Sequence, residues 1–278
     1  MRKACVIGYP VAHSRSPLIH NHWLKTYGIA GIYEKREVKP EQLESFLANL
    51  ETEGYAGCNV TIPHKEAAIP FMAHVDDIVR RMGSLNTIYI REGALHGTSS
   101  DGEGFYQNLM SSVPGLDLKG KTAVILGAGG AARPIIERLL GAGMSKIWVM
   151  NRTKSRAAEL CEAFGPPTEV LTQERYGIES RRTSILINTS SLGMKGQPEL
   201  DIDLSVLPTD AVVADLVYVP LKTALLHRAE ARGLRTVDGL GMLLHQAVTG
   251  FEKWFGIRPE VTPELYDLVA RDVERDQH

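Results

Sequence analysis

The stretch VILGAGGAARPIIERLL, from Val124 to Leu140, decides the fold of this chain. The apolar, partly β-branched run that ends at Leu126 predicts a buried strand. The glycines that begin at Gly127 predict a tight turn, and the apolar spacing up to Leu140 predicts a helix. A second strand-like run, residues 146–150, follows at the spacing of a parallel crossover. The order strand, glycine turn, helix, strand is typical of a dinucleotide-binding fold.

Small residues in this turn suit an approaching phosphate. Gly127 permits the tight turn, Gly129 lets the backbone come close to a pyrophosphate, and Ala132 lets the helix pack against the strand. The free N–H groups at the start of the helix then hold the anion. A glycine-rich turn without a ligand is the alternative. The predicted phosphate loop comprises Gly127, Ala128, Gly129, Gly130 and Ala131.

The residues after the second strand indicate which nucleotide binds. NAD-binding domains have an acidic residue here, which accepts a hydrogen bond from the ribose 2′-hydroxyl. This chain instead has Asn151, Arg152, Thr153 and, further on, Arg156. An arginine offers a planar set of donors to a 2′-phosphate, and a helical turn would put Arg152 and Arg156 on one side. A solvated basic turn is the alternative, but the glycine loop just upstream favours NADP.

Composition excludes several classes of protein. The chain has 278 residues, 44% of them hydrophobic, and a formal net charge of -2, so one large or two medium domains are expected. We find no polybasic run, no apolar run of transmembrane length and no secretion pattern, which argues against nucleic-acid or membrane partners. The three cysteines are isolated and lie in or beside apolar runs, as expected for reduced, buried thiols. We therefore expect a cytoplasmic monomer or homodimer.

Strand and helix patterns alternate along the chain and predict the α/β class. Residues 3–8, 32–38 and 57–61 read as strands, and the helices between them predict a mainly parallel first sheet. Ser16 followed by proline predicts a helix start with Ser16 as the N-cap. The resulting fold class is two-domain α/β, in which a mainly parallel sheet precedes a Rossmann domain. We assign no element between residues 165 and 184.

Polar residues gather where the predicted strands of the first domain end, which is where ligands bind in open α/β sheets. Each residue alone has a simpler reading: Ser16 as a helix cap, Lys65 as a solvated charge, Asn86 as a turn residue and Asp101 as an N-cap. Together they would supply hydroxyls for a carboxylate, amides for hydroxyls and a Lys/Asp pair for proton transfer. The clusters are residues 13–16, 59–65, 86–87 and 99–102.

This combination resembles the shikimate dehydrogenase family. HSRSPLIHN, NVTIPHK, NT at 86–87, DG at 101–102, GAGGAAR, NRT, INTSSLGM and GLGMLLHQA occur in the family's order over nearly the whole chain. The resemblance implies NADPH-dependent reduction of 3-dehydroshikimate to shikimate. It also implies a substrate domain of residues 1–102, joined by returning helices at 243–278, and a Rossmann domain of residues 103–242.

The resemblance also implies residue roles. Lys65 and Asp101 would be the catalytic pair. Ser14 and Ser16 would hold the substrate carboxylate, and Thr61, Asn86 and Gln246 its hydroxyls, with Tyr218 lining the cleft. Thr189, Ser190 and Met194 fall in the cofactor loop. Leu216 belongs to the cofactor site, and Gly239 and Met242 would border the nicotinamide.

The chemistry needs no metal. Hydride arriving at a ketone carbon leaves negative charge on oxygen, which a nearby ammonium stabilises and protonates. His20 and His22 stand two apart on a predicted helix and point to different sides, so we expect no metal site.

The chain departs from the family at two places. Ser99-Ser100 replaces the usual Asn-Thr before Asp101, and Val219 replaces the usual Asn after Tyr218. A quinate/shikimate dehydrogenase with broader cofactor use and a non-catalytic NADP-binding regulator stay open as alternatives.

Overall fold

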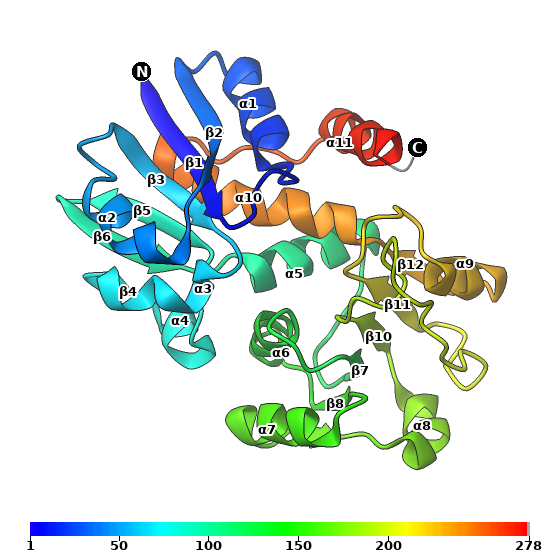
Figure 1. Cartoon of the computed structure of the whole chain (residues 1–278). Coiled ribbons are helices and arrows are strands. Elements are labelled where there is room, and N and C mark those ends of the chain that lie inside the picture. Colours follow the sequence, from blue (N-terminus) through cyan, green and yellow to red (C-terminus); the bar gives the residue numbers. More distant parts are fainter. Residues whose placement is uncertain (277–278) are drawn as a thin grey trace. The chain divides into compact units, whose positions relative to one another are not determined.

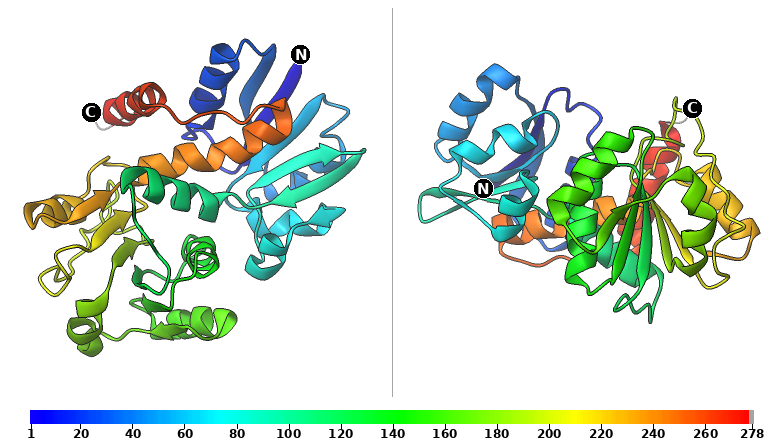
Figure 2. Two further views of the ribbon diagram at one scale, coloured as in Figure 1. Left: turned by 180° about the vertical axis from the view of Figure 1, so that it is seen from behind. Right: turned by 90° about the horizontal axis from the view of Figure 1, so that it is seen from below.

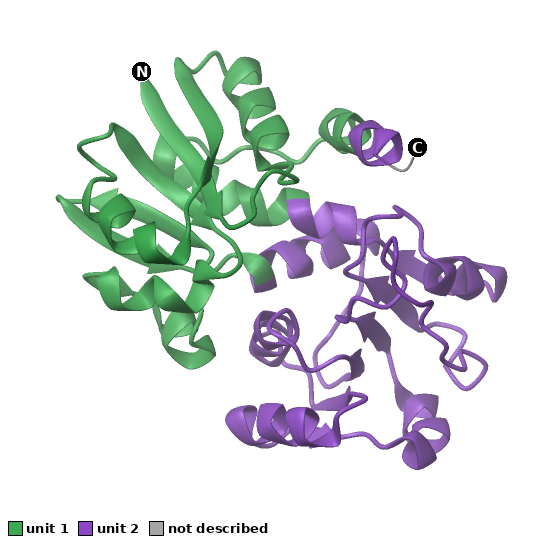
Figure 3. Cartoon of the chain, in the orientation of Figure 1, with its two compact units in different colours: residues 1–101, 244–269 green, residues 102–243, 270–278 purple. Residues whose placement is uncertain are grey.

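The computed structural model describes residues 1–276, whose contacts divide the chain into two compact units (Figure 3). Unit 1 consists of Met1–Asp101 and Leu244–Val269. Unit 2 consists of Gly102–Leu243 and, at the end of the described residues, of residues 270–276. Residues 277–278, the end of the expected returning segment, lie outside the described residues. Both units combine a sheet with helices, which confirms the predicted α/β class (Figure 1).

The sheet of unit 1 has six strands in the order β2-β1-β3-β5-β6-β4. The strands are β1 (Arg2–Gly8), β2 (Gly31–Glu37), β3 (Tyr55–Val60), β4 (His74–Val75), β5 (Thr87–Arg91) and β6 (Ala94–Thr98). The β1 strand pairs in parallel with β2 and β3, whereas β5 runs antiparallel to both of its neighbours. The β4 strand pairs in parallel with β6, so three of the five strand pairs are parallel and the sheet is mainly parallel, as the sequence predicts.

Helices cover both faces of this sheet. They are α1 (Ser16–Thr26), α2 (Leu43–Ala48), α3 (His64–Ala67), α4 (Asp77–Met82) and the unit 1 parts of α10 (Gly239–Phe255) and α11 (Pro263–Arg275), with short 3₁₀ turns at Pro40–Gln42 and Ile69–Phe71. One face carries a hydrophobic core that includes Phe46 and Leu47 of α2 and Val79 of α4. On the other face, aromatic rings of α1 and α10 pack together. The ring of His20 in α1 stacks on that of Phe251 in α10, with 6.0 Å between the ring centroids.

Unit 2 contains an entirely parallel sheet in the order β12-β11-β10-β7-β8-β9. Its strands are β7 (Thr122–Leu126), β8 (Lys146–Met150), β9 (Thr168–Val170), β10 (Ile185–Asn188), β11 (Val212–Asp215) and β12 (Arg235–Val237). Numbered within the unit, this is the order 6-5-4-1-2-3 of a Rossmann fold, which the glycine turn after β7 predicts.

The strands of unit 2 are apolar on both sides because helices cover both faces (Figure 2). The helices are α5 (Asp101–Ser112), α6 (Ala132–Gly141), α7 (Lys154–Phe164), α8 (Gln173–Glu179) and α9 (Ala224–Ala231), with a 3₁₀ turn at Ser180–Arg182. Ile125 of β7 packs in the core shared with α5, α6 and α7. Its neighbour Val124 packs in the core shared with α8 and α9.

The structure corrects three local predictions. The β9 strand and the α8 helix occupy part of residues 165–184, where the pattern indicated no element. Ser16 is the first residue of α1 rather than its N-cap, and the preceding Arg15 makes no side-chain cap bond. Arg152 precedes α7, so it does not share a helical turn with Arg156. Thr153, between Arg152 and the helix, is the N-cap residue and has an extended backbone conformation.

Two further findings concern the chain as a whole. Among residues 1–276, no helix is both long enough and apolar enough to cross a membrane. Cys5, Cys58 and Cys161 are all unpaired and buried, in agreement with the expectation of reduced thiols.

A buried histidine lies in the aromatic face of unit 1. His20 is 0% exposed, and its ring stacks on Tyr33 with 4.1 Å between the centroids. Neither ring nitrogen has a hydrogen-bond partner within residues 1–276. Burial lowers the pKa of His20 from its ordinary value of 6.5 to about 3, so the ring is neutral in the folded protein.

This burial predicts a pH-dependent loss of stability. Between pH 6.5 and about 3 the unfolded chain binds a proton at His20 that the folded chain does not. The contribution is therefore fully present above pH 6.5 and is lost as the pH falls, by up to about 1.4 kcal/mol per pH unit. We expect His20→Phe to flatten the pH dependence of the unfolding free energy below pH 6.5. Urea titrations followed by tryptophan fluorescence at pH 7.5, 6 and 5 measure the unfolding free energy of both proteins. If the two plots of unfolding free energy against pH were parallel, the prediction would be wrong.

Candidate active site

Lys65 and Asp101 form an ion pair in unit 1. The Lys65 Nζ atom lies 2.6 Å from the Asp101 Oδ2 atom, and the two side chains are 33% and 20% exposed. Lys65 stands on α3, next to the buried His64, whose Nε2 atom lies 2.7 Å from the Val38 carbonyl oxygen. The Leu85 N–H donates to the Lys65 carbonyl at 2.9 Å. The backbone that carries the ammonium is therefore fixed from two sides.

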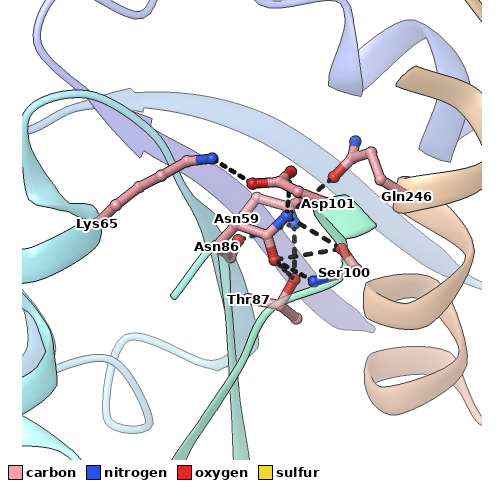
Figure 4. Close-up of polar contacts among 7 residues, drawn as sticks. All are labelled: Asn59, Lys65, Asn86, Thr87, Ser100, Asp101 and Gln246. Atoms are coloured by element: carbon pink, nitrogen blue, oxygen red, sulfur yellow. Dashed lines mark hydrogen bonds and ion pairs between the residues drawn. The ribbon is translucent and has the colours of Figure 1, made fainter. Parts of the chain in front are cut away.

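Asn86 joins this pair to the sheet (Figure 4). Its Nδ2 atom donates to Asp101 Oδ1 at 2.8 Å and to Ser100 Oγ at 3.0 Å, and it lies 3.4 Å from Gln246 Oε1. Its Oδ1 atom accepts from the Ser100 N–H at 3.0 Å. Since a backbone N–H can only donate, this contact fixes which end of the amide is the oxygen. Four of the predicted residues, from α3, α5, α10 and the turn before β5, thus lie together.

The two predicted carboxylate ligands also lie together. The Ser14 Oγ atom is 3.2 Å from the Ser16 Oγ atom and accepts from the Ser16 N–H at 3.3 Å. Thr61 follows β3, where its N–H donates to the Ile7 carbonyl at 2.9 Å. A Cβ at Gly8 would meet the Thr61 methyl at 2.5 Å, so glycine is needed there for Thr61 to pack against β1.

Unit 2 contains a pocket of about 580 Å³ at the carboxyl ends of its strands. Both predicted arginines, Arg152 and Arg156, line it, although only Arg156 lies in α7. The other predicted residues on its wall are Gly127, Asn151, Thr153 and Ser190. The carboxyl ends of parallel strands are where nucleotides bind in such sheets. The pocket also includes Lys154, Thr172, Gln173 and Gln197, which the sequence reasoning did not single out.

The glycine turn leaves room for a phosphate. Gly127 has φ +115°, and a Cβ there would meet Thr189 Oγ1 at 2.8 Å, so no other residue fits without a shift. A Cβ at Gly129 or Gly130 would meet nothing within 4 Å. The α6 helix that follows has no side-chain cap at its N-terminus, so no side chain occupies its first N–H groups, although the Ala132 N–H donates to the Gly129 carbonyl at 3.0 Å. These residues fit a dinucleotide phosphate.

A buried carboxylate holds the loops beside this turn. Asp215 is 2% exposed and accepts from the Thr223 hydroxyl at 2.7 Å, from the Val217 N–H at 3.0 Å and from Asn188 Nδ2 at 2.8 Å. Asn188 Oδ1 in turn accepts from the Ser190 N–H at 3.0 Å. Burial raises the pKa of Asp215 despite these donors. The carboxylate therefore ties the loop after β11 to the predicted cofactor loop after β10.

The remaining predicted residues follow the strands of unit 2. A Cβ at Gly239 would lie 2.2 Å from the Leu216 carbonyl oxygen, so these two predicted residues are in close contact. Met242 packs against the apolar core, and Met194 is 40% exposed. Tyr218 is not on the wall of the 580 Å³ pocket. The predicted cofactor residues that are not on this wall either are Ala128, Gly129, Gly130, Ala131, Thr189, Met194, Leu216, Gly239 and Met242.

Within residues 1–276, no group of three or more histidine, cysteine, aspartate or glutamate side chains is arranged to hold a metal ion. His20 is enclosed by aromatic rings, and His22 is partly exposed on the same helix.

The polar network includes residues that the sequence reasoning named only as members of clusters. Asn59, Thr87 and Ser100 are each at most 6% exposed, and each bonds to Asn86. The signal for them was their position beside predicted site residues at strand ends.

Comparisons with known proteins agree with this arrangement. The family "Shikimate dehydrogenase substrate binding domain" matches residues 6–88. "Shikimate / quinate 5-dehydrogenase" matches residues 108–191, and "Shikimate 5'-dehydrogenase C-terminal domain" matches residues 239–263. A protein of Azorhizobium caulinodans named shikimate dehydrogenase (NADP(+)) is 50% identical over 273 residues, which cover 98% of this chain and 97% of the relative. The chain belongs to the shikimate dehydrogenase family.

Solved structures extend the family relationship to the fold. Shikimate 5-dehydrogenase from Thermus thermophilus, in complex with NADP(H) and shikimate, is 35% identical with a TM-score of 0.86, covering 98% of this chain and 100% of that one. Quinate dehydrogenase from Corynebacterium glutamicum, in complex with NAD, is 27% identical with a TM-score of 0.88, covering 97% and 98%. The two-domain architecture of shikimate dehydrogenases is therefore also that of this chain.

Proposed function

We propose that this chain is an NADP-dependent shikimate dehydrogenase, which reversibly reduces 3-dehydroshikimate to shikimate. The observation that carries the proposal is the 2.6 Å contact between Lys65 and Asp101, with Asn86 bound to the same carboxylate. Family membership and the 50% identical relative named shikimate dehydrogenase (NADP(+)) support the same activity.

Lys65 and Asp101 are the proposed catalytic pair. NADPH, when bound, supplies the hydride that reaches the ketone carbon. Negative charge then develops on the ketone oxygen, where the Lys65 ammonium stabilises it and delivers a proton. Asp101 holds the ammonium in place through its Oδ2 atom and is available to a substrate hydroxyl. In shikimate oxidation the same groups act in reverse.

The other polar side chains of unit 1 bind and orient the substrate in this proposal. Ser14 and Ser16, whose hydroxyls are 3.2 Å apart, hold its carboxylate. Thr61, Asn86 and Gln246 hold its hydroxyls, and Tyr218 lines the substrate cleft. The Nδ2 atom of Asn86 is directed toward Asp101 and Gln246, which supports a shared site for vicinal hydroxyls.

The cofactor site of the proposal lies in unit 2. The phosphate loop from Gly127 to Ala131 holds the pyrophosphate. Arg152 and Arg156 hold the 2′-phosphate, with Asn151 and Thr153 beside them, because guanidinium groups bind phosphate through paired donors. Thr189, Ser190, Met194, Leu216, Gly239 and Met242 complete the site. The arginines on the pocket wall favour NADP over the NAD of the quinate dehydrogenase.

The place of the protein in the cell and its assembly are part of the proposal. Three buried, unpaired thiols suit a reducing compartment, and we propose a cytoplasmic monomer or homodimer without nucleic-acid or membrane partners.

Removing the proposed acid should abolish most turnover. We expect Lys65→Ala to lower kcat by roughly 10² to 10⁴, the range for a general acid, with a much smaller change in KM for shikimate. Steady-state oxidation of shikimate with NADP measures both. Lys222→Ala is the matched control, because its ammonium also forms an ion pair, 2.8 Å from Glu230. A near-normal kcat for Lys65→Ala would remove Lys65 from the mechanism.

Arg152 should decide between the two cofactors. We expect Arg152→Gln to weaken NADP binding by about 1.5–3 kcal/mol, the value of a charge-assisted contact, and to leave NAD binding nearly unchanged. Fluorescence titration with each cofactor measures the two affinities. Arg181→Gln is the control, since this exposed arginine of unit 2 bonds to the Gly177 carbonyl. Equal losses for NADP and NAD would show that Arg152 is structural.

The Ser99-Ser100 sequence should be compatible with activity. Ser100 keeps a hydroxyl 3.0 Å from Asn86 Nδ2. We therefore expect the double replacement Ser99→Asn with Ser100→Thr to change kcat/KM for shikimate by less than about tenfold, or about 1.4 kcal/mol. Kinetics of both proteins with shikimate and quinate test this. If the native protein were inactive on shikimate and the replaced protein active, the proposed substrate would be wrong.

A further inference from the structure

We propose that a chain of buried hydrogen bonds, headed by Tyr33, positions the side chains of Asn86 and Asp101 for the reaction. The inference rests on the proposed function and adds residues to it that do not themselves touch the substrate. Asn59 and Thr87 are the intermediate links.

The proposed hydrogen-bond chain consists of four successive contacts. The Tyr33 hydroxyl lies 2.6 Å from Asn59 Oδ1. Asn59 Nδ2 lies 3.2 Å from Thr87 Oγ1, which lies 2.9 Å from Asn86 Oδ1. Asn86 Nδ2 lies 2.8 Å from Asp101 Oδ1 (Figure 4, which shows the links from Asn59 onward). The first four residues are between 0% and 6% exposed, so water does not compete for these bonds.

The direction of every bond is fixed by chemistry. Asn59 Nδ2 also lies 3.2 Å from the Asn86 carbonyl oxygen, which can only accept, so this atom is the amide nitrogen. Asn59 Oδ1 must then accept from Tyr33. Asn86 Oδ1 accepts from a backbone N–H, so the Thr87 hydroxyl donates to it.

All four donors therefore point toward Asp101. Aligned hydrogen bonds polarise one another, by about 10–30% per bond. The last donor, Asn86 Nδ2, is the group that meets the carboxylate directly. Loss of the first donor leaves Asn59 Oδ1 without the Tyr33 hydroxyl, which weakens the hold of Asn59 on Thr87 and, through Thr87, on Asn86. Tyr33, Asn59 and Thr87 are positioning residues in this scheme.

The fold brings the phenol to this place. Tyr33 stands on β2, opposite Ala4 of β1, and β1 separates it from β3, which carries Asn59. The Tyr33 hydroxyl reaches across β1 to Asn59 Oδ1, which lies 2.6 Å away. The ring of His20, stacked 4.1 Å away, holds the phenol in that orientation.

The test removes single hydroxyls and measures shikimate oxidation at saturating NADP. We expect Tyr33→Phe to lower kcat/KM for shikimate about five- to twentyfold and to leave KM for NADP unchanged. Thr87→Val should give a similar loss, and Thr87→Ser, which keeps the hydroxyl, should restore at least half of the native value. Tyr55→Phe is the matched control, because this buried tyrosine of the same unit donates to Glu34, which is not part of the proposed hydrogen-bond chain.

A double variant separates a connected chain from general destabilisation. If Tyr33 acts through Thr87, Tyr33→Phe combined with Thr87→Val should be within twofold of the worse single variant. Losses that multiply would overturn the proposal, as would a Tyr33→Phe enzyme within twofold of native or an equal loss in Tyr55→Phe. A thermal unfolding transition recorded for every variant, and compared with that of the native protein, verifies that unit 1 is folded. Native protein that fails to oxidise shikimate would overturn the proposed function and this inference with it, whereas an active native enzyme unaffected by Tyr33→Phe would overturn only the inference.

Discussion

The orientation of the Asn86 amide is the constraint on which the candidate site depends. Its oxygen is fixed by the Ser100 N–H at 3.0 Å, and only the opposite end, Nδ2, is then available to Asp101. Because Asp101 also holds the Lys65 ammonium, the position of the proposed acid depends on this one amide. A buried amide rotated by half a turn would place its oxygen against a carboxylate oxygen, and the resulting repulsion would separate the pair. The strand ends, the α3 helix and the start of α5 thus act together through a single side chain.

In unit 2 a buried carboxylate, rather than an amide, holds the loops of the candidate site together. There the loops after β10 and β11 are joined by Asp215, a buried carboxylate that accepts three hydrogen bonds from the protein. Burial raises its pKa, so the ionised form is held at a cost that these donors only partly offset. An apolar residue at position 215 would avoid this cost but would leave the Asn188 amide without this acceptor. The need for that acceptor explains why a carboxylate is buried here. The loop that carries Ser190 is ordered by this contact.

Local sequence patterns were enough to predict most of the fold. The candidate site was predicted from the polar residues that follow the strands. The glycine turn after β7 and the alternation of strands and helices were sufficient to predict the α/β class and a dinucleotide-binding fold, and the structure adds the strand order. The short β9 and α8 elements were missed, because three strand residues and seven helix residues carry too little periodicity. Lys65 and Asp101 were proposed as a pair from the polar clusters at strand ends, and the family resemblance implied their catalytic role. Their contact joins residues 36 apart in the sequence, which no local pattern encodes. Asn59 and Thr87 stood inside recognised clusters, but their connection to Asn86 required three dimensions.

The Rossmann turn illustrates how a correct prediction can rest on an incomplete reason. Gly127 was expected to permit a tight turn, and its φ of +115° agrees. The structure adds a second requirement, since a Cβ would meet Thr189 Oγ1 at 2.8 Å and the Ser190 nitrogen at 3.0 Å. The Asp215–Asn188 network holds that same loop. A larger residue at position 127 would therefore have to displace the loop and break these hydrogen bonds. The glycine and the buried carboxylate are therefore parts of one arrangement, in which close packing of two loops keeps the phosphate turn open at Gly129 and Gly130.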